Sequence, residues 1–207
     1  MGGGSAAPGV LGVTPGGVLG IVLAGGLARR MGGGDKTLLP LRGRPMLAHL
    51  LERLGPQVEA VAVNANGDPS RFAAVAPGVA ITADDMPGYP GPLAGVLAGM
   101  EHAARLGLGW VVTVPGDTPL IPPDLVSRLR EAAGPVACAA SAGRVHPPVA
   151  LWPAGLRGAL REAVLGGEGK VLRWAQGCGL SVVEWAGDPF LNANAPEDLA
   201  VLEAALG

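Results

Sequence analysis

Residues 18–46 read VLGIVLAGGLARRMGGGDKTLLPLRGRPM, an apolar run followed by a loop that is rich in glycine and in cations. The apolar run at 18–24 has the length and composition of a buried strand. The loop after it carries Arg29, Arg30 and Lys36. Glycine lets backbone N–H groups approach an anion closely, and the cations neutralise its charge. The stretch therefore predicts a first strand that leads into a polyphosphate-binding loop.

This loop matches neither of the two common phosphate-binding motifs. A GxxxxGK[ST] motif ending at Lys36 and Thr37 needs glycine where Arg30 and Asp35 stand, and no GxGxxG pattern follows the strand. A glycine-rich loop on its own is often only a structural turn. The function of the loop therefore has to be inferred together with the rest of the chain.

Composition bounds the class of protein. The chain has 207 residues, of which 49% are hydrophobic and 15% charged, and its net charge is −2. These values predict a compact fold, with 17–207 as a single domain and 1–16 as a disordered tail. A net charge this close to zero argues against broad nucleic-acid binding.

Targeting signals and disulfides are not expected. Residues 1–28 lack the cationic start of a signal peptide, Pro8 and Pro15 interrupt their apolar run, and no stretch has the length and hydropathy of a membrane span. Cys138 and Cys178 show neither CxxC nor metal-ligand spacing, which is typical of reduced thiols. We therefore expect a cytoplasmic protein without a membrane partner.

Strand and helix signals alternate along the chain. We expect strands at 18–24, 58–63, 79–82, 110–114, 136–140, 149–152 and 180–185, and helices at 45–54, 93–106, 122–132, 155–165, 170–176 and 196–205. This order predicts an α/β fold of three layers, α/β/α, with a mainly parallel, Rossmann-like sheet.

Polar residues and glycines cluster where the expected strands end. Gly25 and Gly26 follow the first strand, and Asn64, Asp84 and Asp117 follow later ones. Because ligands of such sheets bind at the carboxyl ends of the strands, we expect an active site at this edge.

Two of these carboxylates have chemically distinct uses. Asp117, in TVPGDTPLIPPDL, suits Mg²⁺, which takes one or two carboxylates together with phosphate oxygens and water. Asp84 opens DDMPGYPGPLAG and can accept hydrogen bonds from the N1–H and N2–H₂ groups of guanine, a donor pair that adenine and cytosine lack. The structural alternatives are a helix cap for Asp117 and an Asx turn for Asp84. Asn64 either binds a base or ribose or forms a turn with Gly67.

The string LAGG-x-x-x-RMG-x-x-DK-x-LL-x-L-x-G-x-P at 23–45 resembles the opening signature of nucleotidyltransferases with the GT-A-like fold. Within that group the chain resembles the molybdenum cofactor guanylyltransferases, the MobA family. The segments DDMPGYPGPLAG, PGDTP, HPPVAL and NANAPEDL resemble further parts of the family pattern, so that the resemblance covers 18–207. Ala195 stands where the family usually has threonine, which would also be a natural helix N-cap.

The resemblance implies transfer of GMP from GTP to the phosphate of molybdenum-bound molybdopterin, with Mg²⁺ as cofactor and pyrophosphate as the second product. It implies catalytic roles for Arg30, Lys36 and Asp117, the last also as metal ligand. The nucleotide-binding residues that it implies are Leu23, Ala24, Gly25, Gly26, Lys36, Asn64, Asp84 and Asp117. The molybdopterin-binding residues that it implies are Arg30, Gly33, Asn192 and Asn194.

Two alternatives stay open at this point. The first is a nucleotidyltransferase of the same fold that uses CTP or a sugar phosphate, and Asp84 argues against cytosine. The second is a non-catalytic nucleotide-binding partner of molybdoenzymes, and the presence of both Lys36 and Asp117 argues against it. We expect a monomer whose further partners include molybdopterin-inserting proteins and molybdoenzyme chaperones.

Overall fold

The computed structural model describes residues 16–25, 35–86 and 91–206. The expected disordered tail at 1–16 lies outside these ranges except for Gly16, whose carbonyl accepts a hydrogen bond from Arg130 Nη1. In the described ranges no helix is long and apolar enough to cross a membrane.

The elements follow the predicted alternation. The strands are β1 (Val18–Leu23), β2 (Pro40–Leu41), β3 (Arg44–Pro45), β4 (Ala60–Asn64), β5 (Ala80–Thr82), β6 (Trp110–Pro115), β7 (Val136–Ser141), β8 (Arg144–Pro153) and β9 (Leu180–Trp185). The α-helices are α1 (Met46–Leu54), α2 (Pro92–Arg105), α3 (Leu125–Arg130), α4 (Arg157–Leu165), α5 (Val171–Gly177) and α6 (Pro196–Ala205). Short 3-10 helices are η1 (Lys36–Leu38), η2 (Gly55–Gln57), η3 (Pro69–Phe72) and η4 (Ala154–Leu156).

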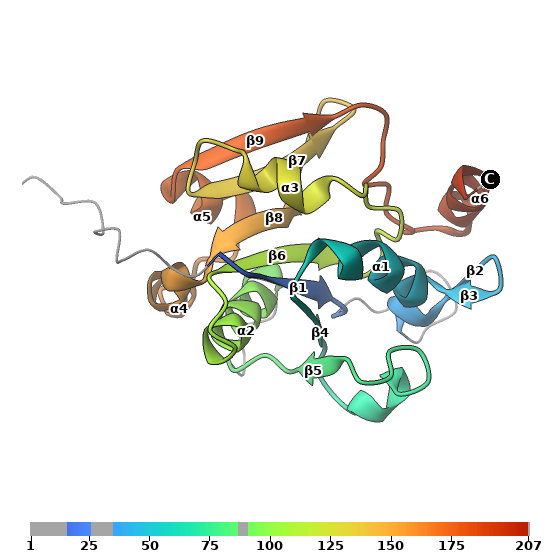
Figure 1. The fold of residues 1–207 in the computed structure, drawn as a ribbon, viewed down its shortest axis with the longest axis horizontal. Helices are drawn as coiled ribbons and strands as arrows, with labels where there is room; N and C mark the ends of the chain where they lie inside the picture. The colour runs from blue at the N-terminus through green and yellow to red at the C-terminus, as the bar shows by residue number, and fades with distance from the viewer. Residues whose placement is uncertain (1–15, 26–34, 87–90, 207) are drawn as a thin grey trace, which may run out of the picture.

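A seven-stranded sheet in the order β5-β4-β1-β6-β8-β7-β9 forms the centre of the molecule (Figure 1). All neighbours in it run parallel except β8, which is antiparallel to both β6 and β7. The prediction of a mainly parallel sheet is confirmed. The strands β2 and β3 form a separate two-stranded ribbon that lies near α6.

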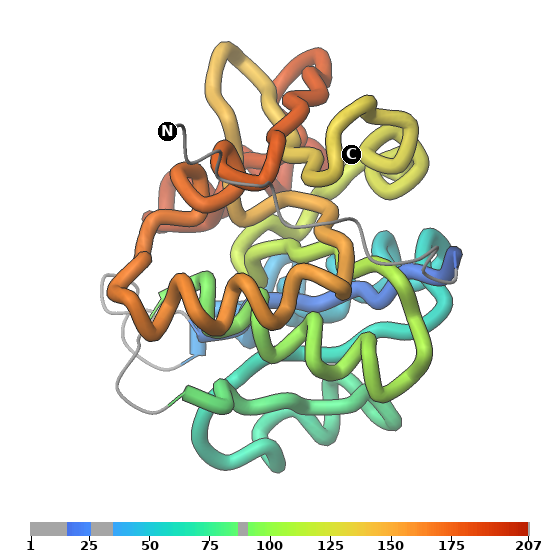
Figure 2. Tube along the Cα trace, turned by 90° about the vertical axis from the view of Figure 1, so that its left-hand side faces the viewer, coloured from blue at the N-terminus to red at the C-terminus, as the bar shows by residue number. Residues whose placement is uncertain are grey.

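Helices cover both faces of the sheet, which confirms the three-layer prediction. Val18 and Val22 of β1 belong to the same buried cluster as the apolar residues of α1 and α3. Leu19 and Ile21, which point the other way because side chains alternate along a strand, pack with those of α2, α4 and α5. Figure 2 shows α2 and α4 side by side on this second face.

The strand β8 begins earlier than the expected 149–152, because Pro147 and Pro148 do not interrupt it. Its pairing with β7 jumps from Ala139 opposite His146 to Cys138 opposite Ala150. Pro147 and Pro148 fall in this irregularity, where the ladder needs no N–H donor. The turn between the strands, Ala142 and Gly143, has positive φ at both positions.

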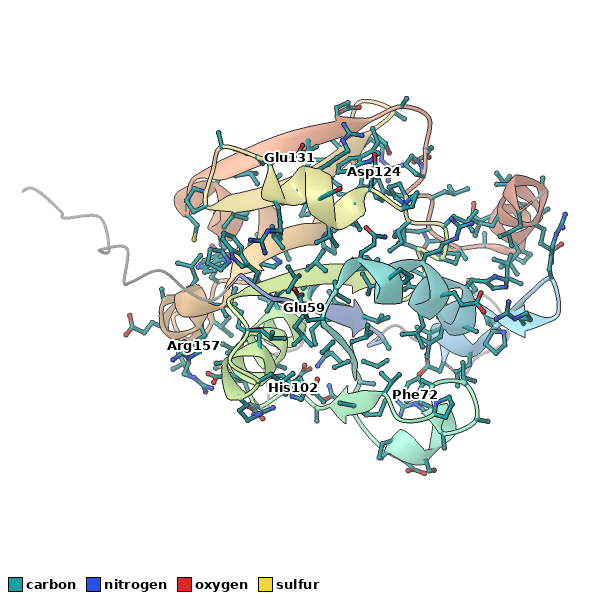
Figure 3. All side chains as sticks on the ribbon, in the orientation of Figure 1. Glu59, Phe72, His102, Asp124, Glu131 and Arg157 are labelled. Carbon is teal, nitrogen blue, oxygen red and sulfur yellow. The ribbon has the colours of Figure 1, made fainter. Side chains whose placement is uncertain are left out.

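The helix α3 is shorter than the expected 122–132. Its N-cap residue, Asp124, which Figure 3 labels at the start of α3, does not cap it. The Asp124 carboxylate accepts a hydrogen bond from Trp185 Nε1 at 3.0 Å instead. The orphan N–H of Val126 is bonded instead by Gln57 Oε1 of η2 at 3.1 Å. The start of α3 therefore depends on the Gln57 side chain of η2, and the sequence alone does not indicate this contact.

The two cysteines are free thiols, and Cys138 is fully buried in β7. Burial raises the pKa of the Cys138 thiol to about 12, because the charged thiolate loses its hydration. This thiol is therefore unreactive at neutral pH.

Gly99 allows α2 to lie close to the sheet, because a Cβ there would sit 2.7 Å from Ile21 Cγ1 and 3.2 Å from Val111 Cγ1. We expect Gly99→Ala to lower the free energy of unfolding by about 1–3 kcal/mol through overpacking. Urea denaturation measures this change. The matched control is Gly158→Ala in α4, where a Cβ would meet no atom within 4 Å beyond its chain neighbours and the backbone of its own helix. Helix propensity should there raise stability by up to about 1 kcal/mol. A gain in both variants would contradict the close packing of α2.

Candidate active site

An open cavity of about 450 Å³ lies at the carboxyl ends of β1, β4, β5 and β6. Its walls come from strand ends, from the start of α2 and from the C-terminal part of the chain. The lining residues are Leu23, Gly25, Lys36, Thr37, Asn64, Asn66, Asp84, Gly91, Pro92, Pro115, Asp117, Pro148 and Asn192. The expected convergence of strand ends on one site is therefore present in the fold.

The structure brings most of the predicted site residues together. Seven of them line the cavity, namely Leu23, Gly25, Lys36, Asn64, Asp84, Asp117 and Asn192. Ala24 is buried beside it, with its N–H bonded to the Asn64 carbonyl at 2.9 Å, and Asn194 contacts Lys36. Gly26, Arg30 and Gly33 lie outside the described residues.

At one end of the cavity two amides hold the Asp84 carboxylate. Asn64 Nδ2 donates to Oδ1 at 2.9 Å, and Asn66 Nδ2 donates to Oδ2 at 2.7 Å. The N–H of Asp84 in turn donates to Asn66 Oδ1 at 2.9 Å. An ionised carboxylate has about four lone-pair directions, so each oxygen can accept a further hydrogen bond from a ligand.

Asn64 is itself fixed by its surroundings. Its Nδ2 also donates to the Thr82 carbonyl at 3.2 Å, and the side chain is almost fully buried. A Cβ on Gly95 of α2 would lie 2.5 Å from Asn64 Oδ1, so only glycine leaves room for this amide. Asn64 thus does more than form a turn, which was the structural alternative.

Asp35 organises the segment that presents Lys36. Its Oδ1 accepts hydrogen bonds from the N–H of Thr37 at 3.1 Å and from Thr37 Oγ1 at 2.7 Å, capping η1. Its Oδ2 pairs with Arg71 Nε at 3.1 Å. This carboxylate braces the chain and pairs with a cation, and the capping geometry places Lys36 at the first position of η1.

The Lys36 ammonium lies at the other end of the cavity, between two oxygens. It donates to Asp117 Oδ2 at 2.7 Å and to Asn194 Oδ1 at 2.6 Å. The Lys36 and Asp117 side chains are only 12% and 19% exposed, so water screens this pair less than an ion pair on the surface. The contact joins η1, the turn after β6 and the segment before α6.

The segment 186–195 delivers the two C-terminal asparagines. Thr118 Oγ1 donates to Asn192 Oδ1 at 2.8 Å, and the Ala193 N–H donates to the Asp117 carbonyl at 2.9 Å. The Asp198 carboxylate accepts hydrogen bonds at 2.8 Å from the N–H groups of both Asn194 and Ala195. Asp198 therefore bonds the start of α6, although Ala195 has no side-chain acceptor.

An aromatic cluster anchors this segment to the sheet. Phe190 is fully buried, packs edge-on against Trp185 with ring centres 5.4 Å apart, and lies tilted by 51° against the His146 ring at 5.1 Å. Ser141 Oγ, 2.8 Å from His146 Nε2, donates to Asp188 Oδ1 at 3.1 Å. Burial, with Arg144 nearby, lowers the pKa of His146, which favours its neutral form. The HPPVAL motif contains His146, but the sequence did not indicate that this ring packs against Phe190.

The residues present suit a divalent cation that is shared with a ligand. The Asp117 carboxylate and the Asn194 amide oxygen already face one cation, the Lys36 ammonium, and oxygen donors are the ligands that Mg²⁺ prefers. Within the described ranges, three or more Asp, Glu, His or Cys side chains nowhere gather into a metal site. Phosphate oxygens and water would therefore have to complete the coordination.

Comparison with known proteins gives a consistent picture. Residues 20–178 match the family model of the MobA-like NTP transferase domain. A molybdenum cofactor guanylyltransferase of Rhodopseudomonas palustris (strain BisB5) is 49% identical over 193 residues, which cover 88% of this chain and 91% of the relative. One of Bradyrhizobium sp. (strain ORS 278) is 47% identical and covers 90% and 92%.

Solved structures share the fold at lower identity. The molybdopterin-guanine dinucleotide biosynthesis protein A of Archaeoglobus fulgidus superposes with a TM-score of 0.71 at 21% identity, covering 91% of this chain and 98% of its own. Rv0371c of Mycobacterium tuberculosis, in its complex with manganese, gives 0.65 at 19% identity, covering 91% and 99%.

Gly116, next to Asp117, is predicted to be intolerant of a side chain, because a Cβ there would overlap with Thr37 Cγ2. We expect Gly116→Ala to lower the free energy of unfolding by about 1–3 kcal/mol. Nucleotide affinity should fall with it, since Thr37 adjoins Lys36.

The rescue variant is Thr37→Ser, which removes the methyl group and keeps the hydroxyl that bonds Asp35. The double variant, Gly116→Ala with Thr37→Ser, should regain most of the lost stability and most of the lost nucleotide affinity. Thermal denaturation and nucleotide titration measure the two quantities. A double variant as weak as Gly116→Ala would place the strain elsewhere.

Proposed function

Since this chain belongs to the family of MobA-like NTP transferases, we propose that it transfers GMP from GTP to the phosphate of molybdenum-bound molybdopterin. The relatives that carry this name are nearly half identical to it over about nine-tenths of both chains. The observation that carries the proposal is the cavity itself. It places an oriented carboxylate at one end and Lys36 with Asp117 at the other.

Asp84 reads the base in this proposal. Each of its two carboxylate oxygens accepts one hydrogen bond from an amide and has a second lone pair available. The carboxylate can therefore also accept hydrogen bonds from the N1–H and N2–H₂ groups of guanine. Adenine offers no such donor pair, and cytosine offers none either. Because β1 lies between β5 and β6 in the sheet order, Leu23, Ala24 and Gly25 at its carboxyl end lie between Asp84 and the phosphate end. The family pattern assigns Gly26 to the nucleotide as well.

Lys36 and Asp117 act on the phosphates. Lys36 neutralises the charge that develops on the departing pyrophosphate, and Asp117 would hold Mg²⁺. When bound, Mg²⁺ supplies a Lewis acid for the phosphate oxygens. The family pattern assigns Arg30, like Lys36, to neutralising the charge on the phosphates. Asn192 and Asn194 orient the acceptor, together with Arg30 and Gly33.

The reaction needs alignment more than proton transfer. An acceptor phosphate oxygen forms a bond to the α-phosphorus of GTP, and the bond to the β-phosphate oxygen breaks, releasing pyrophosphate. A phosphate monoester has a second pKa near about 6, so the nucleophile is largely deprotonated at neutral pH. A general base is therefore unnecessary, and the cavity contributes position and positive charge.

The first test compares pyrophosphate release with GTP, CTP and ATP in the presence of Mg²⁺ and molybdenum-bound molybdopterin. We expect release with GTP alone. Asp84→Asn should reduce the preference for GTP by about 10- to 100-fold, because a hydrogen bond to a charged group is worth about 1.5–3 kcal/mol. The matched control is Asp85→Asn, the same change at the exposed neighbouring carboxylate.

Each other result has a definite meaning. Release with CTP would keep the chemistry and overturn the guanine assignment. GTP binding without release from any nucleotide would favour a different acceptor or a non-catalytic partner of molybdoenzymes. An equal loss of preference in both aspartate variants would remove Asp84 from its role.

Asp117→Ala tests the metal role separately. We expect kcat to fall by about 100-fold or more, because Mg²⁺ would lose its carboxylate ligand and its positive charge would no longer be held against the phosphates. The Kd for GTP should change much less. Steady-state kinetics at several Mg²⁺ concentrations and calorimetric titration of GTP measure the two effects. A kcat close to that of the unchanged protein, with the same dependence on Mg²⁺, would contradict the role.

A further inference from the structure

Asn66 has an unusual bonding pattern for an exposed asparagine in a turn. It precedes Gly67, which has φ +85, and such a residue commonly bonds its own neighbouring backbone. Here both ends of its amide reach Asp84, eighteen residues along the chain. Nδ2 donates to the carboxylate at 2.7 Å, and Oδ1 accepts from the Asp84 N–H at 2.9 Å.

This reciprocal pair fixes a degree of freedom that Asn64 alone leaves open. One donor on one oxygen would let the Asp84 carboxylate turn about its Cβ–Cγ bond. A second donor on the other oxygen sets the plane of the group. Guanine presents its N1–H and N2–H₂ groups side by side, so a carboxylate receives both only when its plane matches that of the base.

Arg71 holds Asn66 from behind. Its Nη2 donates to the Asn66 carbonyl at 2.9 Å, and its Nε pairs with Asp35 at 3.1 Å. The guanidinium lies over the ring of Phe72, 4.4 Å from its centre. Phe72, which Figure 3 labels on η3, is buried in the core. Asn66 is therefore tied both to the core and to the segment that carries Lys36.

We propose that Asn66 is a specificity-determining positioning residue, which aims Asp84 at the 2-amino group of a purine, and that Arg71 keeps it in place. This inference rests on the proposed reading of guanine by Asp84. Asn66 acts through Asp84 and needs no contact with the nucleotide. Its contribution is to discrimination between bases, and the binding of phosphate groups does not depend on it.

The test is equilibrium titration of the full chain with GTP, with ITP, which keeps N1–H but lacks the 2-amino group, and with pyrophosphate. We expect the unchanged protein to bind GTP about 10-fold more tightly than ITP. Asn66→Ala should reduce this ratio by at least 3-fold and change pyrophosphate affinity by less than 2-fold. Asn66→Asp sets a second carboxylate against Asp84 and should weaken GTP binding further.

The control for local damage is Ser70→Ala, which removes the hydroxyl that donates to Asp68 Oδ2 and keeps the backbone cap of η3, the contacts of Arg71 and those of Asn66. It should lower thermal stability and keep the ratio of GTP to ITP affinity. An Asn66→Ala variant that loses affinity for both nucleotides equally would make Asn66 merely structural and overturn the inference. A chain that never distinguishes GTP from ITP and ATP would instead overturn the proposed base reading, and this inference with it.

Discussion

The Lys36 ammonium is the point on which the geometry of the site depends. It bonds one oxygen of Asp117 and one of Asn194, and so connects three segments at a single charged group. Two partly buried charges without each other would each lose hydration without compensation. The parallel sheet supplies the strand end before Asp117, and Asp35 supplies the turn that carries Lys36. The remaining partner, Asn194, comes from a segment outside the sheet.

The segment 186–195 contains no helix or strand, and side-chain packing holds it in place. Phe190 fills a gap between Trp185 and His146, and hydrogen bonds link Asp188 to Ser141 and Asn192 to Thr118. The segment 186–195 is thus anchored by an aromatic side chain and by several polar contacts, including that of Ala193 with Asp117. The base end is built differently, since there two amides and a guanidinium arrange a single carboxylate.

The sequence allowed prediction of those features that local pattern determines. Apolar runs marked the strands, and the residues after them, including Asn64, Asp84 and Asp117, line one cavity as expected. It did not allow prediction of features made by distant side chains. The start of α3 depends on Gln57, and the orientation of Asp84 depends on Asn66. The prolines of β8 concealed a long strand because only the pairing register shows that they need no donor.

The contact between Lys36 and Asn194 spans 158 positions of the chain. A ribosome makes a polypeptide from its N-terminus, so Asn64, Asp84 and Asp117 all exist while Asn194 is still to be added. A contact over so long a separation can form only after the intervening chain exists, and long-range contacts of this kind slow folding more than they change stability. The two ends of the cavity therefore mature at different times during synthesis. A nascent chain contains Asn64, Asn66 and Asp84 before the contact of Lys36 with Asn194 can form at the opposite end of the cavity.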